Sequence, residues 1–512
     1  MRCVTLALLF IVLARGEAVA IELKTGQGML NGTVVDEISA FKDIPFATPP
    51  VGDLRWRAPR PASAWRGVRQ ASEFGPVCPQ NQRFSIFVPK LAQSEDCLTL
   101  NVWTPNPKPG AKLPVMVWIH GGGFLEGGSA VPLYDGTDLA KHGVVVVTIN
   151  YRLGVLGFFA HPSLLGERKD EASGNFGLLD QIAALQWVRD NVASFGGDPS
   201  AVTIFGESAG GVSVNDLIAS PMARGLFKRA ISESGLGLSA VPTLAEAESD
   251  STKFAAKLAI AGNDAATLAR LRGLKVADIL KNQGNLSTEG HVVPFIDGKA
   301  IPADVSVLFA KGDIAKVDYI AGSNSNEASL APALGMDPVA MLGVFGDRLA
   351  TVRSIYETDG ALSDKEFGRQ VFGDALFTSG AQALAGFVAK TGKTARVYQF
   401  AYLANILRGK SPGVGHGGEL IYVFGLRGIG LLGERATDED RRIVDMVQTY
   451  WTNFAKTGDP DGAGLPAWPA FSAASQQTLA IDDTTRSVTD FRKAQVGVME
   501  AGWSKRVGMA GP

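Results

Sequence analysis

The strongest hydrophobic patterns along the chain are two continuous apolar runs, at residues 113–120 (LPVMVWIH) and 143–150 (GVVVVTIN). Both are rich in β-branched residues and lack polar alternation, which is typical of strands in a sheet that is covered on both faces. Residues 175–193 then show helical spacing of apolar positions, and residues 202–205 form another short apolar run. Strands that alternate with helices predict an α/β fold with a mainly parallel sheet.

Outside this central part, the pattern predicts shorter strands and helical insertions. Residues 28–72 alternate short β-like runs with proline-containing turns. Residues 240–290 and 335–395 are mostly helical in pattern, and the strand-like runs 317–321 and 397–403 flank the second of them. We see no internal repeat, linker or low-complexity tract, and we therefore expect one domain that carries these helices as insertions.

The first twenty residues have the pattern of a cleaved signal peptide. Arg2 supplies a positive start, residues 4–13 are apolar, and small residues at 18–20 suit a signal peptidase. An N-terminal membrane anchor is the alternative, but this run is far shorter than the ~20 residues that span a bilayer. No later segment is a convincing membrane span. We therefore expect export to the periplasm or the extracellular space, with a mature domain over residues 21–512.

The charge balance excludes bulk attraction to polyanions. The 512 residues include 49 basic and 51 acidic side chains, with a formal net charge of −2. Neither nucleic acid nor an anionic membrane is therefore an expected partner. With 46% hydrophobic residues, the chain can bury a large core.

Two cysteines, Cys78 and Cys97, remain after removal of the signal peptide. One even pair in an exported chain suggests a disulfide, worth about 3 kcal/mol in the loop-entropy model. Two free buried thiols are the alternative. The pair is too small for a metal site.

Residues 206–210 (GESAG) fit the G-x-S-x-G pattern, in which a strained turn between a strand and a helix exposes a serine. The pattern alone is weak, and a structural glycine turn is the alternative reading. Here an apolar run precedes it and a helix-compatible stretch follows, as the pattern requires. Ser208 is therefore the candidate nucleophile.

Residues 120–124 (HGGGF) follow the first apolar run. Three glycines leave backbone N–H groups unobstructed, which is what an oxyanion hole requires. A merely flexible turn is the alternative. His120 precedes this turn, and we expect it to be structural.

A serine nucleophile needs a base, and the chain has five histidines. On this type of fold the base follows the serine, which leaves His291 and His416. His416 lies in a glycine-rich loop after the run at 397–403, where active sites of α/β sheets lie. His291 lies beside apolar residues, as at a core or edge position. The pattern favours His416.

The acid is expected between the serine and the histidine, just after a strand. Glu327 ends a polar loop that follows the run at 317–321. It could orient the imidazole and stabilise its cation. Asp297, Asp313 and Asp374 remain competitors on spacing alone.

At these residues the chain resembles the type-B carboxylesterase and cholinesterase family of α/β-hydrolases. The matching motifs run along most of the chain and are long and ordered. They lie at 46–56, 95–102, 121–124, 150–158, 174–211, 450–454 and 458–460. Departures also occur: Asn326 and Ala328 flank Glu327 where the family usually has Asp and Gly, and Ile421 replaces a usual proline.

The resemblance implies an α/β-hydrolase fold with a triad of Ser208, Glu327 and His416. It implies an oxyanion hole in which the donors are the backbone N–H groups of Gly122, Gly123 and Ala209. It also supports pairing of the two cysteines. In addition, we expect Glu207 and Ser234 to support the triad from beside it.

The predicted function is hydrolysis of a small-molecule carboxylic ester through an acyl-enzyme, with no metal or organic cofactor. Cholinesterases carry a tryptophan in the loop closed by the first disulfide, where it binds the choline cation. Residues 79–96 contain Phe84 and Phe87 but no tryptophan, so uncharged esters are expected rather than choline esters. A binding protein on the same fold, and an amidase or peptidase, are the alternatives. The oligomeric state is not predicted.

Overall fold

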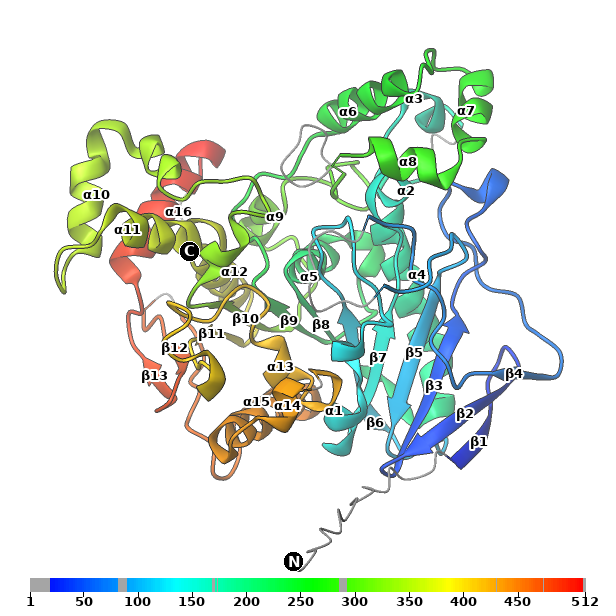
Figure 1. Cartoon of the computed structure of the whole chain (residues 1–512), viewed down its shortest axis with the longest axis horizontal. Coiled ribbons are helices and arrows are strands. Elements are labelled where there is room, and N and C mark those ends of the chain that lie inside the picture. Colours follow the sequence, from blue (N-terminus) through cyan, green and yellow to red (C-terminus); the bar gives the residue numbers. More distant parts are fainter. Residues whose placement is uncertain are drawn as a thin grey trace, which may run out of the picture.

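The computed structural model describes residues 19–81, 90–167, 171–172, 174–284, 292–429, 431–472 and 474–509. In these residues thirteen strands form one sheet (Figure 1). Neighbouring strands follow the order β1-β2-β3-β5-β7-β6-β8-β9-β10-β11-β12-β13, and β4 pairs with β2. The strands are β1 Val19–Lys24, β2 Met29–Val35, β3 Ile38–Pro45, β4 Val68–Gln70, β5 Thr99–Thr104, β6 Leu113–Ile119, β7 Val145–Ile149, β8 Gly197–Glu207, β9 Arg229–Glu233, β10 Asp318–Asn324, β11 Ala395–Phe400, β12 Thr478–Ile481 and β13 Arg486–Val488.

The centre of the sheet, from β7 to β12, is parallel throughout. The strands at both edges pair antiparallel, except that β4 pairs with β2 in parallel. This confirms the predicted α/β fold. Strand β8 begins at Gly197, earlier than the predicted residue 202. The prediction started the strand too late because Asp198 and Pro199 have the sequence character of a turn. A register shift between Leu113 and Val115 accommodates this extra length. Strand β11 ends at Phe400, whereas the sequence predicted an end at residue 403.

Helices cover both faces of the sheet, because side chains of each buried strand alternate between two cores. Along β6, Val115, Val117 and Ile119 belong to one core, while Met116 and Trp118 belong to the other. The first core is covered by α4 Phe176–Asn191, α5 Ala209–Ala219, α9 Val305–Lys311 and α12 Ser379–Lys390. The second is covered by α1 Thr137–Lys141, α13 Leu420–Val423 and α15 Asp438–Thr457.

The stretches predicted as helical insertions form two groups of helices at the periphery (Figure 1). Residues 240–290 contain α6 Leu244–Lys257, α7 Ala265–Arg272 and α8 Val276–Asn282, at the upper right. Residues 335–395 contain α10 Leu349–Tyr356 and α11 Asp364–Gly373, beside the C-terminal α16 Lys493–Val507 at the left, and α12, which packs on the sheet and not at the periphery. The remaining helices are the short α2 Gly154–Gly157, α3 Pro162–Leu165 and α14 Leu431–Glu434.

One helix of the described residues, Asp364–Lys390, is long and apolar enough to cross a membrane by composition, with a mean hydropathy of 1.2. Within the protein, 83% of its apolar window is buried. This is the environment of a core helix. The predicted signal peptide falls mainly on residues 1–18, outside the described residues, and β1 already begins at Val19.

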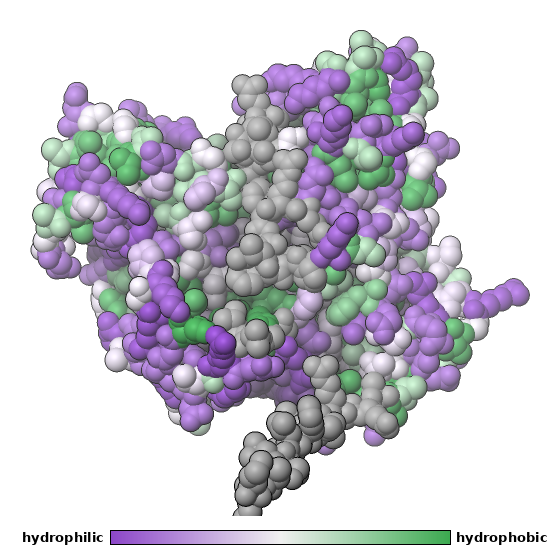
Figure 2. All heavy atoms as spheres, in the orientation of Figure 1, coloured by the Kyte–Doolittle hydropathy of each residue, from purple (hydrophilic) through white to green (hydrophobic). Residues whose placement is uncertain are grey.

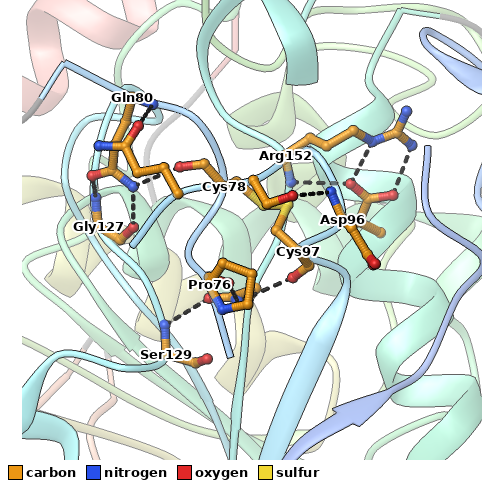
Figure 3. Close-up of a disulfide and its surroundings, with 12 residues drawn as sticks. Pro76, Cys78, Gln80, Asp96, Cys97, Gly127, Ser129 and Arg152 are labelled. Carbon is orange, nitrogen blue, oxygen red and sulfur yellow. Dashed lines mark hydrogen bonds and ion pairs between the residues drawn. A yellow bond between two sulfur atoms is a disulfide. The ribbon is translucent and has the colours of Figure 1, made fainter. Parts of the chain in front are cut away.

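Cys78 and Cys97 form a disulfide with a Cα–Cα distance of 5.1 Å (Figure 3). Asn150 reinforces the same loop, since its Nδ2 donates to the carbonyls of Pro76 and Cys97. The disulfide therefore fixes the start of a loop whose Gln80 bonds Gly127, in the segment that follows β6.

Candidate active site

Ser208 lies on the sharp turn between β8 and α5, with φ 57° and ψ −122°. Such a conformation costs about 1–3 kcal/mol and persists only where its surroundings enforce it. Here the Ser208 N–H donates to the Glu233 carbonyl at 2.9 Å. A Cβ at Gly206 or Gly210 would collide with the backbone of Ile119, which explains why both positions need glycine. The turn projects Ser208 into a cavity.

His416 lies in the loop between β11 and α13, and its ring is held by Glu327. The Nδ1–H of His416 donates to Glu327 Oε2 at 2.6 Å. Glu327 follows β10 and is 1% exposed. Its other oxygen accepts from Ser234 Oγ at 2.6 Å and from the Asn324 N–H at 2.7 Å. The carboxylate is therefore held in place by bonds other than the one to the imidazole.

The loops carrying Glu327 and His416 are also tied together by their backbones. The His416 N–H donates to Ser329 Oγ at 2.8 Å, and the Asn326 N–H donates to the Val414 carbonyl at 2.8 Å. The Asn326 bond uses only its backbone, so the unusual side chain at this position leaves the connection intact. The geometry thus brings the acid and the base together.

His416 and Ser208 line the same cavity, and the second ring nitrogen of His416, Nε2, is a buried atom. This Nε2 is 3.2 Å from Glu207 Oε1, but within the described residues it forms no hydrogen bond, either to Glu207 or to Ser208. Catalytic hydrogen bonds are often absent before substrate binds. With Nδ1 bearing the proton, Nε2 carries the lone pair that a general base requires.

The glycine turn after β6 lines the same cavity. Gly122 and Gly123 have φ values of 104° and 61°, a region that favours glycine. A Cβ on Gly122 would collide with the Glu126 carbonyl. Among the described residues, the N–H groups of Gly122, Gly123 and Ala209 have no hydrogen-bond acceptor. They are therefore available to a ligand.

The cavity has a volume of about 590 Å³. One wall is apolar, and its described side chains include Leu236, Val293, Leu330, Leu334, Met336, Leu376 and Phe377. The polar part includes Gln80, Glu126, Tyr134 and Glu207, of which sequence reasoning identified only the last. Figure 2 shows hydrophilic and hydrophobic residues intermingled on the visible surface of the two peripheral helical groups.

Buried carboxylates surround the base. Burial alone lowers the pKa of His416, but the Glu207 and Glu327 carboxylates outweigh it and raise that pKa above its ordinary value. Burial raises the pKa of Glu207. It also raises the pKa of Glu233 and Glu419, whose carboxyl groups bind Trp451 and Asn324 respectively. Glu233 and Glu419 were missed from the sequence, although Glu419 lies three residues after His416.

The competing residues have other partners. Asp313 pairs with Arg224, Asp374 with Arg492, and Asp297 accepts from the Lys299 and Ile301 N–H groups.

His120 is buried and stacks on Tyr151, and burial lowers its pKa to about 4. His291 lies outside the described residues. In the part that is described, no three His, Cys, Asp or Glu side chains are grouped to hold a metal ion.

Comparison with known proteins shows the family. The model of the carboxylesterase family matches residues 18–359 and 351–498. The chain belongs to the carboxylesterase family. This carboxylesterase is therefore a serine carboxylic ester hydrolase, and the predicted family resemblance is confirmed.

The similar proteins are esterases, and the similarity extends over most of their length and of this chain. Fumonisin B1 esterase of Sphingopyxis macrogoltabida is 36% identical over 463 residues, covering 87% of this chain and 84% of that protein. Para-nitrobenzyl esterase of Bacillus subtilis (strain 168) is 36% identical over 478 residues, covering 90% and 94%. A solved PNB esterase structure has a TM-score of 0.80 at 34% identity, covering 93% of this chain and 99% of that one. The α/β-hydrolase fold of this carboxylesterase is thereby confirmed.

The contact between Glu207 and His416 predicts a change in the pH dependence of the esterase. A His416 that acts as the general base must be neutral, and in that case kcat/KM should rise with pH through the pKa of His416. A Glu207→Gln variant loses a carboxylate that raises this pKa, so the rise should move to lower pH by about 1 unit. The measurement is kcat/KM against pH for the variant, the wild type and a Glu500→Gln control. Glu500 also has a raised pKa but lies outside the cavity. An unchanged profile for Glu207→Gln would show that this carboxyl carries no charge in the working enzyme.

Proposed function

We propose that the esterase works through a triad of Ser208, His416 and Glu327 with an acyl-enzyme intermediate. The observation that carries this proposal is the bond from His416 Nδ1–H to the buried Glu327, which leaves Nε2 unprotonated in a residue that lines the same cavity as Ser208. Family membership supports the reaction class. The strained turn at Ser208 supports its role as the nucleophile.

In the first half-reaction, Ser208 Oγ attacks the ester carbonyl carbon while His416 Nε2 takes the hydroxyl proton. The carbonyl oxygen becomes an oxyanion, which accepts hydrogen bonds from the N–H groups of Gly122, Gly123 and Ala209. The bond to the leaving oxygen then breaks, and His416 returns the proton to the departing alcohol. Water repeats these steps on the acyl-enzyme and releases the acid. Glu327 stabilises the imidazolium in both halves.

Reaction with a fluorophosphonate tests the nucleophile directly. Ser208 Oγ should attack phosphorus and expel fluoride, leaving one covalent adduct per chain in the intact mass. A Ser208→Ala variant should stay unlabelled under the same conditions. An adduct located by peptide mapping on another residue would refute the assignment, and complete absence of labelling would favour a binding protein on this fold.

We propose that the preferred substrates are small uncharged esters. The described wall of the cavity is largely apolar, with no tryptophan on it. Residues 79–96 contain no tryptophan either, and the two phenylalanines of that loop, Phe84 and Phe87, lie outside the described residues. A quaternary ammonium is bound best over a tryptophan face, so the site offers choline little compensation for its lost hydration.

A matched pair of esters tests this preference. A choline ester and its uncharged 3,3-dimethylbutyl isostere present the same carbonyl with nearly the same shape. We expect kcat/KM to be at least about tenfold higher for the uncharged ester, since the cation–π energy of about 1–2 kcal/mol that a cage supplies is missing. A higher kcat/KM for the choline ester would overturn the proposal.

A further inference from the structure

Gln80 lines the cavity and is only 4% exposed. Its side-chain amide pairs with both backbone groups of Gly127 (Figure 3). Oε1 accepts from the Gly127 N–H at 2.8 Å, and Nε2 donates to the Gly127 carbonyl at 2.7 Å. Nε2 also donates to the Cys78 carbonyl at 2.9 Å. One side chain therefore joins the disulfide loop to the segment after β6.

Gly127 packs directly against the beginning of the glycine turn. A Cβ on Gly127 would lie 2.6 Å from the Gly121 carbonyl oxygen and would also collide with the His120 ring. Between Gly121 and Gly127, the N–H groups of Leu125 and Glu126 both donate to the Gly122 carbonyl at 3.1 Å. Because the turn is closed in this way, a shift of Gly127 is transmitted to the donors at its start.

Gln80 is itself held from the opposite side. Its backbone N–H donates to Gln93 Oε1 at 2.9 Å, and the Val77 N–H donates to the Ala92 carbonyl at 2.9 Å. The disulfide at Cys78 adds a covalent attachment. The backbone around Gln80 is therefore fixed where the side-chain amide binds Gly127.

We infer that Gln80 is a positioning residue that fixes the oxyanion donors of the glycine turn. This inference rests on the proposed role of the Gly122 and Gly123 N–H groups. Three successive glycines have no side chains to restrict their backbone, yet an oxyanion hole works only if its donors are already in place. The paired amide of Gln80 supplies that restriction from outside the turn.

The experiment compares Gln80→Leu, which removes both bonds to Gly127, with Gln80→Glu, which retains the size and the acceptor. The control is Gln382→Leu, because Gln382 is a 1% exposed amide that binds the Phe491 carbonyl and lies outside the cavity. Since misplacement of reacting groups by about 1 Å can cost ~10²-fold, we expect kcat to fall about 10- to 100-fold in Gln80→Leu. KM should stay within about threefold, and Gln382→Leu should keep the wild-type kcat.

A thionoester substrate gives a measurement that general destabilisation of the fold should leave unchanged. Sulfur is a weaker hydrogen-bond acceptor than oxygen, so a thionoester gains less from the hole than the matching ester. The ratio of ester to thionoester kcat/KM should therefore fall in Gln80→Leu and remain unchanged in Gln382→Leu. The loss of kcat should also be equal for esters that differ in acyl and alcohol groups.

Three results would overturn the inference. One is a folded Gln80→Leu that keeps its kcat and its ester to thionoester ratio. Another is a loss that appears in KM and varies with the ester, which would mean that Gln80 contacts the substrate. The third is failure of both Gln80 variants to fold, which would make the residue purely structural. The proposed triad is tested separately, by fluorophosphonate labelling of Ser208 and by the activities of the Ser208→Ala and Glu327→Gln variants.

Discussion

Replacing Ser208 with alanine should lower kcat for ester hydrolysis by about 10⁵- to 10⁶-fold, the loss seen when a serine nucleophile is removed from a triad. The variant retains the oxyanion donors and the base but has no oxygen to form the acyl-enzyme. The fold should be unaffected, since Ser208 contributes to it through its backbone N–H. The measurement is the steady-state rate with circular dichroism and the unfolding temperature.

The matched control for this variant is Ser213→Ala. Ser213 lies on the same helix α5, is fully buried, and accepts a hydrogen bond from Gln181 at 3.0 Å. It does not line the cavity. We expect near wild-type kcat with a lower unfolding temperature. A Ser208→Ala enzyme with more than about one hundredth of the wild-type rate would contradict the mechanism, because it would require another nucleophile.

Replacing Glu327 with glutamine should lower kcat by about 10⁴-fold. Glu327 accepts three hydrogen bonds, from His416, Ser234 and Asn324. A glutamine amide group would oppose at least one of these donors and would favour the wrong tautomer of the imidazole. It would also remove the charge that stabilises the imidazolium. KM should change little, because Glu327 does not line the cavity.

Asp313→Asn is the control for the acid, because spacing alone left Asp313 as a competitor. Its pair with Arg224 is largely exposed, and exposed pairs contribute about 0–1 kcal/mol. We expect an unchanged kcat. If Asp313→Asn lost as much activity as Glu327→Gln, or if Glu327→Gln stayed within tenfold of the wild type, the assignment of the acid would be wrong.

The parts of the site that the sequence predicted best are those encoded in short contiguous segments. Ser208 with its flanking glycines, and the turn at 121–124, each carry their chemistry within five residues. Strands β6 and β7 were equally clear, because a continuous β-branched run has few other uses. The start of β8 was missed, since residues 197–201 have the composition of a turn and only pairing with β6 extends the strand.

The pairing of Glu327 with His416 was harder to predict from the residues alone, since spacing left four acids as candidates. Only the family resemblance, and then the contact between two loops that residues 335–395 separate in the sequence, distinguish Glu327 from Asp297, Asp313 and Asp374. Gln80, Glu233 and Glu419 were not identified as parts of the site at all. Their contacts join segments that are far apart in the sequence, and neither spacing nor composition records such contacts.

The position of the site along the chain has a consequence for biogenesis. The glycine turn, Ser208, Glu327 and His416 follow one another from residue 121 to residue 416, and β11, which precedes the histidine loop, pairs with β10 and with the late strand β12. Parallel strands joined by long crossovers form slowly, because each pairing closes a long loop. With the proposed triad, a nascent chain that has emerged only as far as the nucleophile should therefore be inert as an esterase. We expect hydrolysis to begin only when the final third of the polypeptide has joined the sheet.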